Sequence, residues 1–213
     1  MIMHHTTDPI CSHKNPVNLA GFLSRSTVNG PGTRAVIWVQ GCPIRCEGCF
    51  NPDFWSFSPE NLVPVSQLAE RIIALKNIDG ITFSGGEPFA QAQALASLGT
   101  LVQEAGLSVI TYTGFSYDQI LGKKRRSWQY LLSVTDLLVA GPYIPSLDCK
   151  KPLAGSSNQE LISLTGKIAV PHGDNKDNTE DVEFTVSPEG NIITTGFPRY
   201  HFVRKLAFRS NGV

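Results

Sequence analysis

The chain has 213 residues, 41% of them hydrophobic, and its 18 basic side chains balance its 18 acidic ones. This composition supplies enough apolar surface for a globular domain and excludes a disordered or fibrous protein. The zero net charge argues against a protein that binds nucleic acid or an anionic membrane through charge alone.

Up to about residue 141, short runs rich in β-branched residues alternate with longer runs of helical periodicity. The predicted strands are 35–39, 81–84, 107–112 and 136–140, and the predicted helices are 66–76, 90–105 and 127–133. Because strands separated by helices form right-handed βαβ units, this order predicts an α/β fold with a parallel sheet. Sites in such folds usually lie in loops at the carboxyl ends of the strands.

The composition changes after Tyr143. Residues 143–181 are rich in Pro, Gly, Ser, Asn and Lys, which predicts mostly loop. Two short β-type runs, 182–186 and 192–195, then stand on either side of a Ser-Pro-Glu-Gly-Asn turn. We predict a small C-terminal β-hairpin as an appendage to the α/β body.

Three of the five cysteines lie in one loop, directly after the first predicted strand. Cys42, Cys46 and Cys49 have the spacing C-x3-C-x2-C. Three thiolates on one short loop can hold three corners of a 4Fe-4S cluster and leave the fourth iron open to a small molecule. This spacing therefore favours a cluster that carries out chemistry over one that only transfers electrons.

Two other interpretations of the cysteine loop stay open. One is a zinc site with His13, Cys11 or Cys149 as the fourth ligand, and the other is a set of unrelated thiols.

No apolar run approaches the ~20 residues of a membrane span, and the first residues do not resemble a signal peptide. We therefore expect a cytoplasmic protein without a membrane partner, whose clustered cysteines serve metal or redox chemistry.

A glycine-rich turn, Ser84-Gly85-Gly86-Glu87-Pro88, follows the second predicted strand. Its two glycines let the backbone approach a ligand closely, and Glu87 adds a carboxylate. The turn matches neither the phosphate-loop pattern nor the dinucleotide-binding pattern. Taken alone it is typical of an ordinary turn, and its interest comes from lying one βα unit after the cysteine loop.

Together, the cysteine spacing and the GGEP turn resemble the motifs of radical S-adenosylmethionine (SAM) enzymes. Further runs resemble the activating enzymes of anaerobic ribonucleotide reductase: 29–34 (NGPGTR), 39–43 (VQGCP), 49–52 (CFNP) with Trp55, 112–115 (YTGF), 140–143 (AGPY), 155–159 (GSSNQ) and 196–198 (GFP). The resemblance extends discontinuously from residue 18 to residue 198. Many radical SAM proteins have an aromatic residue just before the third cysteine. This chain has Gly48 there, and in this it resembles the reductase-activating type.

The resemblance implies a partial (βα) half-barrel of the radical SAM type, because the chain is short for a complete barrel. Its core would be 18–142, and 143–213 would be a loop-rich extension with the hairpin.

The resemblance also implies the roles of the site residues. Cys42, Cys46 and Cys49 would hold the 4Fe-4S cluster, whose open iron would chelate SAM. Gly85, Gly86 and Glu87 would position the SAM amino group, and Thr113 would contact its ribose or its methionine end.

The implied reaction is the reductive cleavage of SAM to methionine and a 5′-deoxyadenosyl radical, which takes a hydrogen atom from a glycine Cα. The implied partner is a glycyl radical enzyme, the anaerobic ribonucleoside-triphosphate reductase, with a flavodoxin or ferredoxin as reductant. One alternative is a radical SAM enzyme that acts on another peptide or small molecule, and another is a zinc-binding module without activity.

The basic run 123–126 is interpreted as a solvated surface, with docking of an acidic partner as the alternative.

Overall fold

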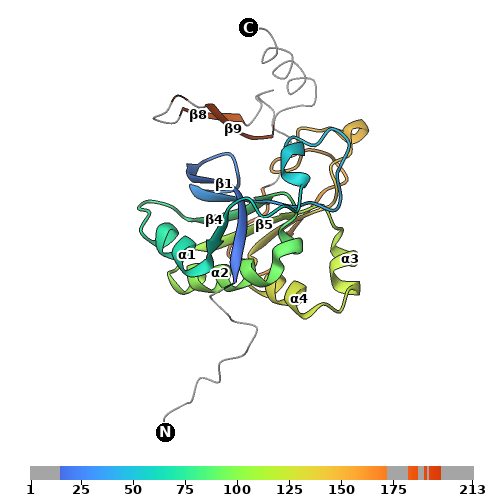
Figure 1. Ribbon diagram of the computed structural model, residues 1–213. Helices are drawn as coiled ribbons and strands as arrows, with labels where there is room; N and C mark the ends of the chain where they lie inside the picture. The colour runs from blue at the N-terminus through green and yellow to red at the C-terminus, as the bar shows by residue number, and fades with distance from the viewer. Residues whose placement is uncertain (1–14, 172–181, 187–189, 191, 198–213) are drawn as a thin grey trace.

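The computed structural model describes residues 15–171, 182–186, 190 and 192–197. A seven-stranded sheet has the order β3-β1-β2-β4-β5-β6-β7, and β8 and β9 form a separate two-stranded sheet (Figure 1). The strands are β1 (Pro16–Ser26), β2 (Arg34–Val39), β3 (Leu62–Pro64), β4 (Gly80–Gly85), β5 (Ser108–Thr113), β6 (Leu137–Ala140), β7 (Glu160–Ser163), β8 (Val182–Val186) and β9 (Ile192–Gly196). The α-helices are α1 (Val65–Ile73), α2 (Ala92–Glu104), α3 (Tyr117–Gly122) and α4 (Arg126–Ser133), and the 3-10 helices are η1 (Pro52–Trp55), η2 (Pro88–Gln91) and η3 (Pro145–Leu147).

The centre of the large sheet consists of four parallel strands, β2, β4, β5 and β6. Helices lie between them in the chain: α1 before β4, α2 before β5, and α3 with α4 before β6. This is the βαβ connection that the alternating sequence pattern predicts, and the α/β fold is confirmed.

Antiparallel strands flank the parallel centre on both sides, and the sequence pattern did not predict them. β7 lies in the region predicted as mostly loop, and for these four residues that prediction is wrong. A strand of four residues is too short to show a clear period, and its pairing with β6 stabilises it. β1 pairs with both β2 and β3, and a register shift near Gly21 interrupts its alternation.

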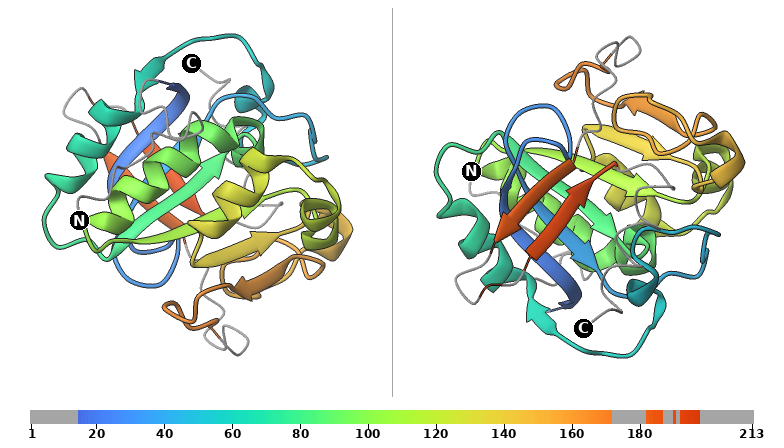
Figure 2. Two further views of the ribbon diagram at one scale, coloured as in Figure 1. Left: turned by 90° about the horizontal axis from the view of Figure 1, so that it is seen from below. Right: turned by 90° about the horizontal axis from the view of Figure 1, so that it is seen from above.

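The α-helices of the described residues lie on one face of the large sheet, and the β8–β9 hairpin lies over the opposite face (Figures 1 and 2). On the helical face, Leu68, Leu95 and Leu131 pack with Ile37 and Phe83 in the main hydrophobic core. None of the helices in the described part of the chain is long and apolar enough to cross a membrane. Because the helices occupy one face, the other face is left to loops and to the hairpin.

Arg34 joins three parallel strands at their starting ends. Its buried guanidinium donates to the carbonyl oxygens of Ile81 and Ser108, both at 2.8 Å, and to Thr82 Oγ1 at 3.0 Å. Burial lowers the pKa of Arg34 to about 10, so the group is still charged at neutral pH. These bonds hold β2, β4 and β5 side by side below the ends that carry the cysteine loop and the glycine-rich turn.

The predicted C-terminal hairpin is confirmed: β8 and β9 pair antiparallel from Val182 with Gly196 to Val186 with Ile192. Hydrogen bonds of Glu183 and Thr195 attach it to the end of β1 and to the connection between β1 and β2. Ser26 Oγ donates to Glu183 Oε2 at 2.6 Å, and Asn29 Nδ2 donates to Thr195 Oγ1 at 2.9 Å.

Candidate functional site

One pocket lies at the carboxyl ends of β2, β4 and β5. It is bordered by the cysteine loop, the glycine-rich turn, the end of β5 and the hairpin. The lining residues include Cys42, Cys46, Cys49, Gly85, Gly86, Glu87, Thr113 and Thr194 to Phe197. All residues predicted to hold a cluster or SAM therefore border a single hollow.

One row of side chains crosses the sheet beneath this hollow. Trp38 pairs with Ser84 in the register of β2 and β4, and Tyr112 follows Thr111, which pairs with Phe83. Since successive side chains of a strand point to opposite faces, these three share the face without helices. The hollow has the small Ser84 between two aromatic side chains.

The cysteine loop folds back onto η1. The Cys42 N–H donates to the Trp55 carbonyl oxygen at 3.2 Å, which fixes the start of the loop. Arg45 has a φ of 53° and Gly48 a φ of 70°, so the backbone turns in the left-handed region on both sides of Cys46. These turns place three thiols from eight consecutive residues along one pocket.

The three thiols influence one another electrostatically. Cys42 is buried, and Cys46 and Cys49 are half-buried. Burial raises the pKa of Cys42 and of Cys46, and the charge of Cys49 raises both further. In number and chemistry, three thiolates that share a hollow fit an iron–sulfur cluster with three protein ligands. Among the described residues, no three donors already converge as the ligands of a metal ion do.

A zinc site would need a fourth ligand beside these thiols. Cys149 is not among the residues that line the pocket, and its N–H donates to the Gly155 carbonyl oxygen at 3.4 Å in a separate loop. Cys11 and His13 lie outside the described residues. Within the described ranges, the pocket lining holds three thiols and no imidazole.

The glycine-rich turn packs directly against the end of β2. Gly86 N donates to Val39 O at 2.7 Å, and Glu87 N donates to Gly41 O at 2.9 Å. A Cβ on Gly86 would lie 2.5 Å from the Gly41 oxygen, and Gly85 has a φ of 100° that favours glycine. The turn and the start of the cysteine loop are therefore in backbone contact.

Glu87 is buried, and the protein itself satisfies its carboxylate. Oε1 accepts from Phe89 N at 2.8 Å and from Thr113 Oγ1 at 2.9 Å, and Oε2 accepts from Gly114 N at 2.9 Å. Burial raises the pKa of Glu87 to about 7 in spite of these bonds. Thr113 Oγ1 also accepts from Phe115 N at 3.1 Å. Both side chains thus join the turn to the end of β5, and their contact with SAM stays a prediction.

The sequence patterns missed the wall of the pocket that the hairpin forms. Asn29, Thr195 and Phe197 line the pocket, but no site role was predicted for them. The Phe197 ring lies over Tyr112, with 5.8 Å between the ring centroids. Since 166 positions separate Asn29 from Thr195, no local pattern could reveal their contact. The sequence feature that could have indicated this wall is the run 196–198, which resembles the activating enzymes of anaerobic ribonucleotide reductase.

Comparisons with known proteins agree with an iron–sulfur site. Residues 28–162 match the model of a family described as a 4Fe-4S single cluster domain. The chain is 31% identical over 160 residues to pyruvate formate-lyase-activating enzymes of Staphylococcus aureus, among them those of strains USA300, NCTC 8325 and COL. The alignment covers 71% of this chain and 63% of each relative, so the chain spans less than two thirds of their length.

Proposed function

Because the chain belongs to the family of 4Fe-4S single cluster domains, we propose that it is a radical SAM enzyme that activates a glycyl radical enzyme. The observation that carries this proposal is that Cys42, Cys46 and Cys49 share one pocket with Gly85 and Gly86. The likeness to pyruvate formate-lyase-activating enzymes supports the activating role.

In this proposal Cys42, Cys46 and Cys49 hold the cluster, and SAM lies beside Gly85 and Gly86. When bound, the cluster supplies the electron that cleaves SAM to methionine and a 5′-deoxyadenosyl radical. Glu87 and its hydrogen bonds keep the turn after β4 and the end of β5 in fixed positions beside the thiols.

We propose the partial (βα) half-barrel as the architecture of the core, 18–142, with 143–213 as its extension. An open sheet with its α-helices on one face (Figure 2), and with a pocket lined by Trp38, Ser84 and Tyr112 of the other face, supports this proposal.

The partner proposed first is the anaerobic ribonucleoside-triphosphate reductase, with a flavodoxin or ferredoxin as the reductant. The runs 29–34, 112–115 and 155–159, which resemble its activating enzymes, support this choice, and each contributes to the pocket lining. The second candidate is pyruvate formate-lyase, which the 31% identity to its activating enzymes favours. A radical SAM enzyme for another peptide or small molecule would use the same cluster site.

The first test is SAM cleavage by the chain after anaerobic reconstitution and reduction with dithionite. Wild-type protein should form 5′-deoxyadenosine, and Cys46→Ala should lower this to background because the cluster loses a ligand. Cys149→Ala is the matched control, since it removes a thiol outside the pocket lining and should retain cluster content and cleavage. Equal activity in the two variants would contradict the site, and bound zinc without iron or sulfide would contradict the function.

The partner is tested by adding each candidate to the reduced protein with SAM. A glycyl radical doublet in the electron paramagnetic resonance spectrum should appear on the reductase and not on pyruvate formate-lyase. The reverse result would assign the second partner. Cleavage of SAM without a radical on either protein would direct the search to another substrate.

A further inference from the structure

The β9 strand borders the pocket with its inner face and with one edge. Thr194, Thr195, Gly196 and Phe197 line the pocket without a gap. Successive residues of a strand direct their side chains to opposite faces, so a strand whose face bordered the hollow would contribute every second residue. Thr195 and Phe197 reach the hollow from the inner face, beside Asn29 and Tyr112. Thr194 lies opposite Phe184 on the outer face, so it reaches the hollow through its backbone, which places the edge of the strand at the hollow as well.

This edge of β9 has no partner strand among the described residues. β9 pairs with β8 on its other side, and the two strands form a sheet of their own. In an antiparallel pair, every second residue directs its N–H and C=O groups away from the partner. Such an unpaired edge is a template for another extended chain, and several peptide-binding domains recognise their ligands by adding a strand in this way.

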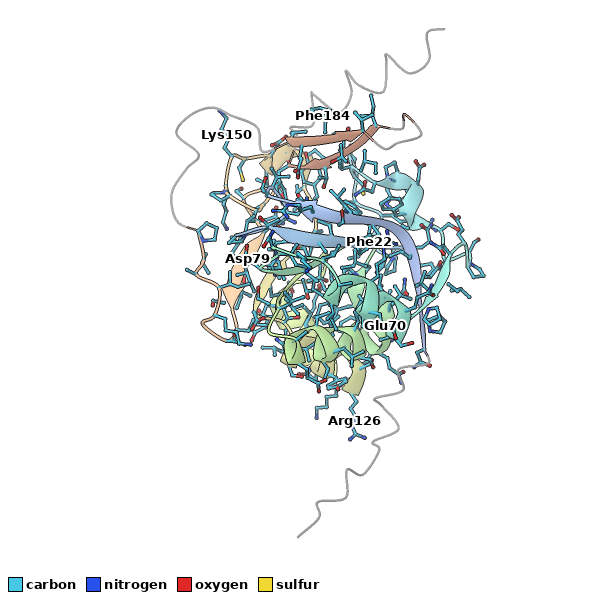
Figure 3. All side chains as sticks on the ribbon, turned by 90° about the vertical axis from the view of Figure 1, so that its left-hand side faces the viewer. Phe22, Glu70, Asp79, Arg126, Lys150 and Phe184 are labelled. Carbon is cyan, nitrogen blue, oxygen red and sulfur yellow. The ribbon has the colours of Figure 1, made fainter. Side chains whose placement is uncertain are left out.

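The hairpin holds this edge at a defined place. Glu183 and Thr195 lie opposite each other in the register, so they share one face, and this face carries the bonds to Ser26 and Asn29. The outer face carries Phe184, whose side chain points away from the sheet at the top of Figure 3 and is 53% exposed. The inner face is thus anchored, and the edge of β9 is left for a ligand.

The pocket lining also contains two hydrogen-bond donors without a partner. Trp55 Nε1 and the Tyr112 hydroxyl are buried, and neither has a hydrogen-bond partner among the described residues. Buried donors are normally satisfied, so these two atoms are exceptions within the described residues. The backbone of an extended polypeptide would instead pair with the edge of β9, which has no partner strand among the described residues.

We propose that the substrate enters the pocket as an extended polypeptide that pairs, over 194–197, with the edge of β9 that has no partner strand in the described ranges. Gly196 has a φ of 115°, and the Phe197 ring that follows it lies over Tyr112 at the wall of the pocket. At this place the ring would pack against a side chain of the bound polypeptide. The inference rests on the proposed function in one respect, since that function requires a protein substrate. It adds the form in which this substrate binds and the strand that receives it.

The test uses the reconstituted full chain with SAM, and the probes are overlapping peptides that tile the reductase and pyruvate formate-lyase. A peptide that binds should slow backbone amide exchange across 192–197. N-methylation at alternate nitrogens of this peptide should weaken binding about tenfold, because every second N–H pairs with β9, and methylation at the intervening nitrogens should not. Binding without this alternation, or without protection of β9, would overturn the proposal.

Two phenylalanines of the hairpin region provide matched variants. Phe197→Ala should weaken peptide binding about tenfold, since it removes the ring that faces Tyr112. Phe184→Ala removes the same side chain from the outer face and should leave binding unchanged. Equal effects of the two substitutions would contradict the edge as the binding site.

Failure of this inference is distinguishable from failure of the proposed function. Cleavage of SAM with no protection of β9, by any peptide or by either whole partner protein, would overturn strand addition and leave the radical SAM function intact. Protection of β9 without any cleavage of SAM would support strand addition and would contradict the radical SAM function.

Discussion

Glu87 is a buried carboxyl group that three donors stabilise and that still resists ionisation. Its three hydrogen bonds favour the charged form, while burial favours the neutral form and raises its pKa to about 7 from 4.5. The larger effect is therefore desolvation. Since Glu87 joins the glycine-rich turn to β5, its protonation state affects the stability of the site as well as its charge.

The folded protein should become less stable as the pH rises from 4.5 to about 7, because the folded state retains the proton of Glu87 and the unfolded state releases it. This contribution is fully present below pH 4.5 and lost by about pH 7, and amounts to about 3 kcal/mol. Glu87→Gln should remove it. Urea unfolding of metal-free protein across this pH range measures the effect, and parallel pH profiles of the variant and the wild type would contradict it.

Gly86 tests the backbone contact between the glycine-rich turn and β2. Gly86→Ala should lower the free energy of unfolding by about 3 kcal/mol, because the new Cβ would meet the Gly41 and Val39 oxygens, which are backbone atoms. Gly122→Ala is the control, since nothing lies within 4 Å of its new Cβ, and it should change the value by less than about 1 kcal/mol. Denaturant unfolding gives both free energies. Equal losses in the two variants would contradict the close backbone contact between Gly86 and the end of β2.

At the level of elements, the hairpin depends on a small polar network more than on apolar burial. Thr195→Val should leave the buried Asn29 amide short of a partner and cost about 1–2 kcal/mol. Amide exchange should accelerate in 182–197 and not in β4 or β5. Thr194→Val, the neighbouring position without a side-chain hydrogen bond in the described structure, should have little effect, and equal acceleration in both variants would contradict the anchoring role.

The parallel elements were predictable from sequence, and the flanking ones were not. The run 35–39 is buried on both faces and is therefore continuous in its apolar character, and 81–83 is buried as well, with Thr82 as its polar member. β7 and β3 have four and three residues, and they form because a neighbouring strand offers hydrogen bonds. Such strands are defined by pairing, which a local pattern does not contain.

At the level of the whole molecule, one part of the candidate site was predictable from the sequence and another part was not. The thiols and the glycine-rich turn each come from one short segment, so the sequence singled out both segments, and the family resemblance suggested their roles. Their joint pocket follows from the parallel order of β2 and β4. The opposite wall is formed by Asn29, Tyr112 and Phe197, which meet through the tertiary fold. No spacing rule links positions so far apart in the chain.

The distance of 166 positions between Asn29 and Thr195 also has a consequence for protein synthesis. Domains fold on the ribosome from the amino-terminal end, so the cysteine loop and the parallel strands emerge well before the hairpin does. Until residue 197 has left the exit tunnel, the pocket lacks one wall. Iron and sulfide delivered during translation would therefore meet a thiol site without this wall, whereas delivery to the finished chain would meet the complete pocket.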